Sequence, residues 1–232
     1  MTYSRYCEGD LPTKQYSDIL QSIYDDPNYY LTILESNKER LRSILAYEKS
    51  KRAIINMLNL DAERNAKIDD VIDYLLCKCD DITPLALQKA LYYIQGFYYA
   101  FMGGYLFSDD CEAWIHGPAY REIYYRYCSK KYDPIESNDE CDNSKLSSSE
   151  KLIIDSVIKN LCCYSGKTLE KFTHTEMPWL NTRRDLPAAV ASDRIIEKQL
   201  IGDYFLAVKK KYDMLEPSDI MNYSKRMFEK IN

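Results

Sequence analysis

The chain has 232 residues, of which 46% are hydrophobic and 29% charged, a balance typical of a folded globular protein. Its net charge is −5 and no run of lysines and arginines forms a stripe, which argues against a nucleic-acid-binding protein. The N-terminus lacks a signal-peptide pattern, and the absence of any window of about 18 uninterrupted apolar residues excludes a membrane-spanning helix. We therefore expect a soluble, cytoplasmic protein that does not bind a membrane.

The eight cysteines are expected to be free thiols, because a chain without a signal peptide is expected in the reducing cytosol. The close pairs are Cys77-Lys78-Cys79 and Cys162-Cys163. Neither has the C-x₂₋₄-C spacing of a zinc knuckle, and the two histidines, His116 and His174, lie far apart in the sequence. We predict no metal site and no cofactor.

The first part of the chain, residues 1–66, is expected to be a short helical extension. Apolar residues recur at helical spacing in residues 15–25 and again in residues 27–45, and a third helix is expected at about residues 48–60. The most basic point of the sequence lies in this third helix and consists of Lys49, Lys51 and Arg52. We interpret this cluster as an ordinary solvated face.

From residue 67 to residue 232 the pattern predicts a compact, mainly α-helical domain. Residues 67–79 have an amphipathic pattern, after which Thr83 can cap a new helix and Pro84 suits its first position. This next helix is apolar on nearly every side until the glycine pair Gly103-Gly104 ends it. We expect it to be the central buried helix.

A small β element is expected after the central helix, from two short extended segments at about residues 105–107 and 112–115. Gly117 is then expected to turn the chain and Pro118 to begin a helix that runs to about Tyr127.

The rest of the domain is expected to alternate loops with helices. Residues 133–149 are polar and acidic and predict a surface loop. Ser147 and Glu150 match a capping box in front of another helix. A last helix is expected from about Ser192 into the lysine-rich residues 209–211.

The two histidines are the candidate catalytic groups of an enzyme hypothesis. Cys111 could pair with His116, and Cys162 or Cys163 with His174, as a nucleophile with its base. The sequence has no G-x-S-x-G elbow and no H-E-x-x-H pair, so nothing in the spacing singles out such a site. We favour a structural role, in which His174 stabilises the tight turn at residues 173–176, and we expect no enzyme activity.

Three polar residues, Gln88, Lys89 and Gln95, stand on the otherwise apolar central helix. Buried polar groups must be paired, so these side chains could join the helix to the turns that hold Trp114 and His174. Alternatively they lie at the rim of a groove. We favour the structural pairing.

Tyrosines are frequent after Gly117 and Pro118, and such rings are enriched at protein interfaces. A single core-facing stripe cannot use all of them, so some are expected to reach the surface. The candidate interface residues are Tyr120, Tyr124, Tyr125 and Tyr127.

Three segments of the chain together resemble the Panacea domain, the family of the SocA-type antitoxins and of GepA-like proteins of mobile genetic elements. They are LALQKALYYIQGFYYAF, then EAWIHGPAYREIYYRY, then LEKFTHTEMPW followed by SDRIIEKQLIGDYF. The resemblance covers about residues 68–208. Ala119 stands where the family more often has valine. The positions that match the family motifs, as structural or interface residues, are Gln88, Lys89, Tyr92, Gln95, Trp114, Gly117, Pro118, Thr173, His174 and Trp179.

This resemblance implies a mainly helical fold with a small β element and an antitoxin function. Such a protein neutralises a cognate toxin, encoded beside it, by direct protein–protein binding. The alternatives are a proteolytic adaptor that delivers the toxin to a protease and a DNA-binding transcriptional autorepressor.

Residues 3–20 resemble the tail of a helix-turn-helix module that precedes such domains in longer relatives. Because most of that module would be absent, we do not expect this chain alone to bind nucleic acid. The N-terminal helices could instead add toxin contacts or form a homodimer.

Overall fold

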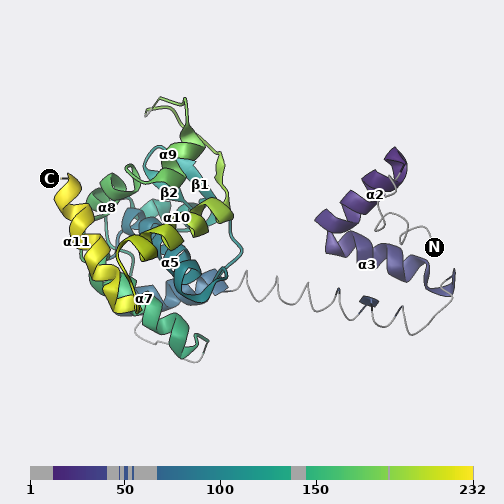
Figure 1. Ribbon diagram of the computed structural model, residues 1–232, viewed down its shortest axis with the longest axis horizontal. Coiled ribbons are helices and arrows are strands. Elements are labelled where there is room, and N and C mark those ends of the chain that lie inside the picture. The colour runs from purple at the N-terminus through teal and green to yellow at the C-terminus, as the bar shows by residue number, and fades with distance from the viewer. Residues whose placement is uncertain are drawn as a thin grey trace. The chain divides into compact units, whose positions relative to one another are not determined.

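A computed structural model of the chain describes residues 13–40, 47, 50, 51, 54, 67–136, 145–187 and 189–231. The described residues are mainly helical with a small three-stranded sheet, which confirms the predicted fold class (Figure 1). The chain divides into two compact units, Met1–Glu63 and Arg64–Asn232. No helix within the described residues is long and apolar enough to cross a membrane.

The N-terminal unit contains α2 (Lys14–Asp25) and α3 (Pro27–Ser36), which confirms the first two predicted helices. The side chain of Thr13 caps α2, and Asp26 caps α3 directly before the proline at its first position. The prediction that the second helix continues to residue 45 is wrong, because α3 ends at Ser36 and is followed by the 3₁₀ turn η1 (Lys38–Arg40).

Two other predictions for this unit fall partly or wholly on residues outside the described ranges. They are most of the third helix, at about residues 48–60, and two members of the basic cluster, Lys49 and Arg52. The remaining member, Lys51, forms an ion pair with Glu35, with Nζ 2.5 Å from Oε1.

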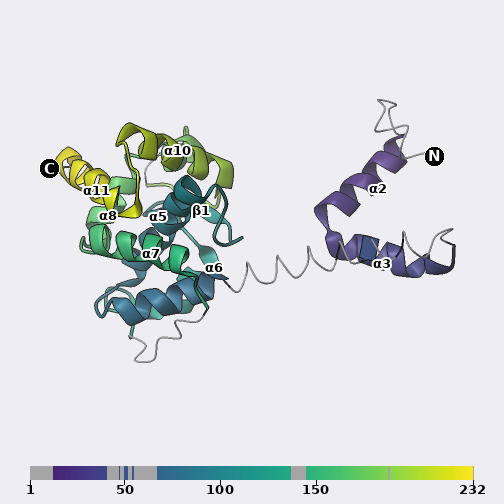
Figure 2. The same ribbon diagram turned by 60° about the horizontal axis from the view of Figure 1, so that its bottom comes forward.

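The C-terminal unit is built around α5 (Pro84–Met102), which is the central buried helix that the sequence predicts. Thr83 caps its first turn, and Gly103 ends it in the left-handed conformation with φ of 74°. Residues 67–78 form the helix before it. Helices α10 (Lys198–Lys211), α8 (Gly166–Thr173) and α7 (Ser148–Asn160) pack around α5 (Figure 2).

Helices α5 and α10 approach closely because a glycine lies on each side of the contact. A Cβ atom on Gly96 would lie 2.1 Å from Cδ2 of Phe205, and one on Gly202 would lie 2.7 Å from the ring of Tyr99. The aromatic rings thus fill the space that side chains at these two positions would need, which fixes α10 against the central helix.

The sheet has the strand order β2–β1–β3 and is antiparallel throughout. Strand β1 (Cys111–Trp114) pairs on one side with β2 (Gly117–Ala119) and on the other with β3 (Ile195–Ile196). The predicted strand at residues 105–107 is therefore wrong, since β1 takes its partners from two other segments.

The helix predicted from Pro118 begins later, as α6 (Arg121–Tyr127), followed by the 3₁₀ turn η2 (Cys128–Lys130). Pro118 belongs instead to β2, which is an edge strand, where the missing N–H of proline is tolerated.

The remaining helices lie towards the C-terminus. The predicted capping box of Ser147 and Glu150 is present at the start of α7. The short helix α9 (Met177–Arg183) follows α8, and the 3₁₀ turn η3 (Pro217–Asp219) leads into α11 (Ile220–Ile231). The last predicted helix begins at Lys198 instead of Ser192, because residues 195–196 form β3; α11 was not predicted.

The expectation that all cysteines are free thiols is wrong at one position. Cys79, Cys111, Cys128, Cys162 and Cys163 are free, as expected. Cys77 is disulfide-bonded, so the expectation of a free thiol is wrong at that position.

Candidate functional site

Two glutamines on α5 bind the backbone of the segment that follows the helix. Gln88 accepts a hydrogen bond from the N–H of Tyr120 at 2.6 Å and donates to the carbonyl of the same residue at 3.3 Å. Gln95 binds two neighbouring residues in a similar way: it accepts a hydrogen bond from the N–H of Leu106 and donates one to the carbonyl of Phe107. Both glutamines are buried and paired, but their partners are the backbone groups of residues 106, 107 and 120 and not the turns that hold Trp114 and His174.

Lys89 is the third polar residue of α5, and its side chain is only 1% exposed. Its Nζ donates a 2.8 Å hydrogen bond to the carbonyl of Pro118. Burial disfavours the charged ammonium and lowers the pKa of Lys89 to about 7. The pKa of a lysine shifts readily when the side chain is buried, and a nearby anion would favour its charged form.

Gly117 brings the turn between β1 and β2 close to Lys89. Its φ of 92° lies in the left-handed region, which favours glycine. A Cβ atom here would lie 2.6 Å from Oγ1 of Thr173 and 2.9 Å from Nζ of Lys89. Three motif positions that are distant in sequence therefore meet at this turn.

The third motif packs against the same turn through two rings. The rings of His174 and Trp179 stack, with centroids 4.1 Å apart, and the indole N–H of Trp179 donates to the carbonyl of Trp114 at 2.8 Å. Partial burial is the main cause that lowers the pKa of His174, which keeps its ring neutral near physiological pH.

The cysteine–histidine pairs of the enzyme hypothesis are not assembled in the described residues. His116 interacts with Glu170 at 3.0 Å through Nδ1. Burial raises the pKa of the Cys111 thiol to about 12, which opposes the formation of a nucleophilic thiolate. No hydrogen bond joins His174 to Cys162 or Cys163 in the described structure, and no group of three or more His, Cys, Asp or Glu side chains there is placed to hold a metal ion.

A fully buried carboxylate, Glu176, lies beneath the third motif and was not recognised from the sequence. Tyr92 and Tyr93 donate their hydroxyl groups to it at 2.8 and 2.7 Å, and Tyr223 of α11 donates a third hydrogen bond. Burial is the main cause that raises the pKa of Glu176. These bonds explain Tyr92 as a structural motif residue, while Glu176 itself was visible only as one more polar residue in THTEMPW.

Trp114 is held in place by a second polar cluster. Arg121 binds both carboxylate oxygens of the buried Glu112, at 2.7 and 2.6 Å, and the indole N–H of Trp114 donates to the same carboxylate at 2.7 Å. The ring of Trp114 also packs edge-to-face against that of Tyr124 of α6, with the ring centroids 4.9 Å apart.

These elements enclose a groove of about 370 Å³ between the first turns of α5 and α8, the β1–β2 turn and the end of α6. We call it the motif groove, because Gln88, Lys89, Trp114 and Gly117 are among its lining residues. Its walls carry three large rings, from Trp114, Tyr124 and Tyr132. Its basic side chains are Lys89, Lys131, Lys167 and His116, and no acidic residue lines it.

The four tyrosines of the candidate interface lie in different environments. Tyr124 is 39% exposed and lines the motif groove, and Tyr125 beside it is 63% exposed. Tyr120 is in the core, with its ring 5.5 Å from that of Phe107, and Tyr127 is partly buried against the core. Tyr132, which is 86% exposed and lines the groove, was not predicted, because it lies beyond the tyrosine-rich helix in a segment without a local pattern.

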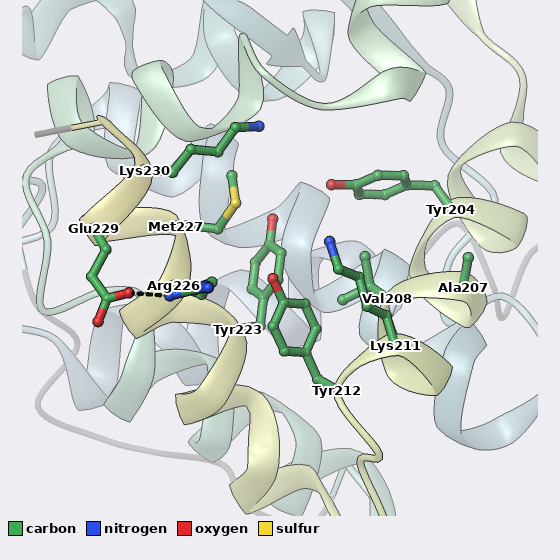
Figure 3. Close-up of a pocket in the computed structure, with 10 residues that line it drawn as sticks. All are labelled: Tyr204, Ala207, Val208, Lys211, Tyr212, Tyr223, Arg226, Met227, Glu229 and Lys230. Atoms are coloured by element: carbon green, nitrogen blue, oxygen red, sulfur yellow. Dashed lines mark hydrogen bonds and ion pairs between the residues drawn. The ribbon is translucent and has the colours of Figure 1, made fainter.

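A second cavity, of about 720 Å³, lies between α10 and α11 (Figure 3). Figure 3 shows the hydroxyl groups of Tyr204 and Tyr212 and the amine of Lys211 pointing towards its interior. Arg226 at its edge is paired with Glu229 at 2.8 Å. None of the predicted site residues lines this cavity.

Comparison with known protein families gives one match. The family model described as antitoxin SocA-like, Panacea domain, matches residues 87–180, which confirms the resemblance seen in the sequence. No curated protein and no solved structure matches the chain significantly. The matched segment contains most of the motif groove, from Gln88 to Lys167, whereas the cavity between α10 and α11 lies outside it.

Proposed function

We propose that this chain, whose residues 87–180 match the model of the SocA-like Panacea antitoxin family, neutralises a cognate toxin by binding it directly. The observation that supports this most is the motif groove, where residues of the first two family motifs form an open hollow edged by exposed aromatic rings. Aromatic side chains at the centre of an interface supply much of its binding energy, because a large ring buries area at little entropic cost.

A rigid framework behind the groove supports a binding role. Gln88 and Lys89 of α5 bind the backbone of Tyr120 and Pro118 through buried hydrogen bonds, and Arg121 of α6 binds Glu112 of β1; these bonds hold the groove wall. A preformed surface binds its partner with less loss of conformational entropy than a mobile one. Inhibition would then be stoichiometric masking of the toxin in the cytoplasm, with no chemical step.

Growth of a bacterial host tests this function. The neighbouring reading frame is induced with and without co-expression of the chain, and the two purified proteins are mixed and separated by size. We expect induction alone to stop growth, the chain to restore it, and a complex to elute. A harmless neighbour, or toxicity that the chain leaves untouched, would refute the antitoxin proposal.

The amounts of toxin protein and toxin transcript in the same cells separate direct neutralisation from the adaptor and repressor alternatives. Direct binding leaves the amount of toxin in the cell unchanged, whereas a proteolytic adaptor lowers it in a protease-dependent way. A DNA-binding repressor would lower toxin transcript without forming a complex with the toxin. The one described member of the basic cluster, Lys51, is paired with Glu35, which does not favour a role for it in DNA binding.

A further inference from the structure

We propose that the motif groove binds a short acidic segment of the toxin, in which an Asp or Glu side chain lies beside an apolar or aromatic residue. This inference rests on the proposed antitoxin function and adds the binding surface and the chemistry of the bound segment.

The charge of the groove favours an acidic ligand. Lys131 and Lys167 are exposed at its surface, Lys89 is buried within its wall, and no acidic residue lines it. Glu170, a carboxylate that contacts two of the lining residues, is already shared, because Lys167 binds one of its oxygens at 2.8 Å and His116 the other at 3.0 Å. Lys131 has no ion pair with any residue that the structure describes. The groove therefore carries its positive charge mainly at Lys131, although the whole chain has a net charge of −5.

The apolar walls of the groove favour a ligand that also has an apolar or aromatic side chain. Trp114, Tyr124 and Tyr132 present ring surface beside the lysines, and Pro84 and Leu85 add aliphatic surface from the first turn of α5. A phosphate backbone would be recognised by cations arranged along an extended track, whereas a single positive pocket between apolar walls suits a carboxylate on a peptide. This favours a protein segment as the ligand over a nucleic acid.

The size of the groove limits the segment. A volume of about 370 Å³ is at the lower end of ligand-sized pockets, so it holds one or two side chains of a partner but not a packed helix. The contact would thus be an anchor within a larger interface, with the exposed Tyr125 at its rim available for surrounding contacts.

The position of Lys131 gives further support. Its φ of 54° and ψ of −101° are unusual for a residue with a side chain, and its N–H bonds to the carbonyl of Cys128. A backbone conformation of this kind persists only where the surrounding structure enforces it, and such residues are frequent at binding sites. Here it belongs to a groove-lining lysine that forms no ion pair within the described part of the chain.

Charge reversal on the 232-residue chain tests the proposal. Binding of the toxin encoded by the neighbouring reading frame is measured by calorimetry for the wild type, for Lys131→Glu and for the control Lys211→Glu. The control makes the same charge change at an exposed lysine of the other cavity. We expect Lys131→Glu to weaken binding about tenfold in about 50 mM salt and less in about 500 mM salt, because ions screen the interaction. Lys211→Glu should bind as the wild type does.

A charge swap then identifies the segment. Each Asp and Glu of the toxin is changed to Lys in turn, and we expect one such change to weaken binding to the wild type and to restore binding to Lys131→Glu. Equal binding of the two antitoxin variants, or the absence of any restoring change, would overturn the groove assignment while wild-type binding still supports the antitoxin function. A wild-type chain that binds no toxin would overturn both.

Discussion

The ammonium group of Lys89 donates a 2.8 Å hydrogen bond to the carbonyl oxygen of Pro118, and this bond joins the central helix to the β1–β2 turn. No ion pair connects Lys89 to any residue that the structure describes. A lysine so deeply buried is costly to charge, which is the physical reason for its low pKa. The bond therefore joins two sequence motifs through a group that titrates near neutral pH.

This burial predicts a pH-dependent stability that Lys89→Met should remove. Because the pKa of Lys89 falls from 10.5 to about 7 on folding, the unfolded chain binds more protons than the folded chain between these values. The free energy of unfolding should then rise with pH across this window, by up to about 1.4 kcal/mol per pH unit. Methionine has a similar shape and no charge, so Lys89→Met should lack this contribution.

Urea denaturation of both proteins at pH 7, 8 and 9 measures the difference. Other titrating groups are common to the two chains and cancel in it. The difference in free energy of unfolding between wild type and variant should move in favour of the wild type as the pH rises. Two curves that run parallel over this range would contradict a depressed pKa for Lys89.

Gly117 provides a second prediction, with Gly103 as its matched control. Both have positive φ, 92° and 74°, but a Cβ atom at Gly117 would meet Thr173 and Lys89, whereas one at Gly103 would meet nothing within 4 Å. Gly103→Ala should cost about 1 kcal/mol of backbone strain alone. Gly117→Ala should cost about 2–4 kcal/mol, because a close contact adds to that strain.

Thermal or urea denaturation of the two alanine variants checks this comparison. The measurement needs no toxin, so it tests the packing of the turn separately from the proposed function. Equal losses at the two glycines would show that the β1–β2 turn can move away from Thr173 at little cost.

The central helix could be predicted from the sequence because its signals are local. Thr83, Pro84 and Gly103 mark its ends, and its apolar composition predicts burial. The pairing of Gln88 and Gln95 also followed from the rule that buried polar groups need partners.

The small β element could not be predicted in detail, because its partners are set by tertiary contacts. Residues 105–107 have a strand-like composition, but Gln95 binds the backbone of Leu106 and Phe107, so these groups need no neighbouring strand. Strand β3 has only two residues and lies far along the chain from β1, which leaves no local signal. The role of Glu176 depends on Tyr223 of α11 in the same way.

Glu176 supports a third prediction, on stability. Replacing it by alanine leaves the hydroxyl groups of Tyr92, Tyr93 and Tyr223 without their shared acceptor in the core. Each buried donor without a partner costs about 1–3 kcal/mol, so Glu176→Ala should cost more than about 3 kcal/mol or prevent folding. Tyr223→Phe removes one donor together with its need for a partner, and should cost only about 1 kcal/mol.

Urea denaturation of the Tyr223→Phe variant, and soluble yield of both variants, provide the measurement. If Glu176→Ala were as stable as Tyr223→Phe, the three hydroxyl groups would have found other acceptors or water. The carboxylate would then not be the centre of this part of the core.

The last prediction concerns two adjacent tyrosines of α6 and the binding of toxin. Tyr124 lines the motif groove and contacts Trp114, whereas Tyr125 is more exposed and does not line the groove. Truncation of an anchoring ring at the centre of an interface costs about 2 kcal/mol or more, and truncation at the rim costs little. Tyr124→Ala should therefore weaken toxin binding by a factor of about 30, and Tyr125→Ala by less than about threefold.

Calorimetric titration of the toxin with each variant gives the two affinities, and the melting temperature of each variant shows whether the fold is intact. Both rings are partly exposed, so neither change should abolish folding. Should Tyr125→Ala prove the more damaging of the two, the toxin would contact the outer face of α6, and the groove beside Trp114 would not be the centre of the interface.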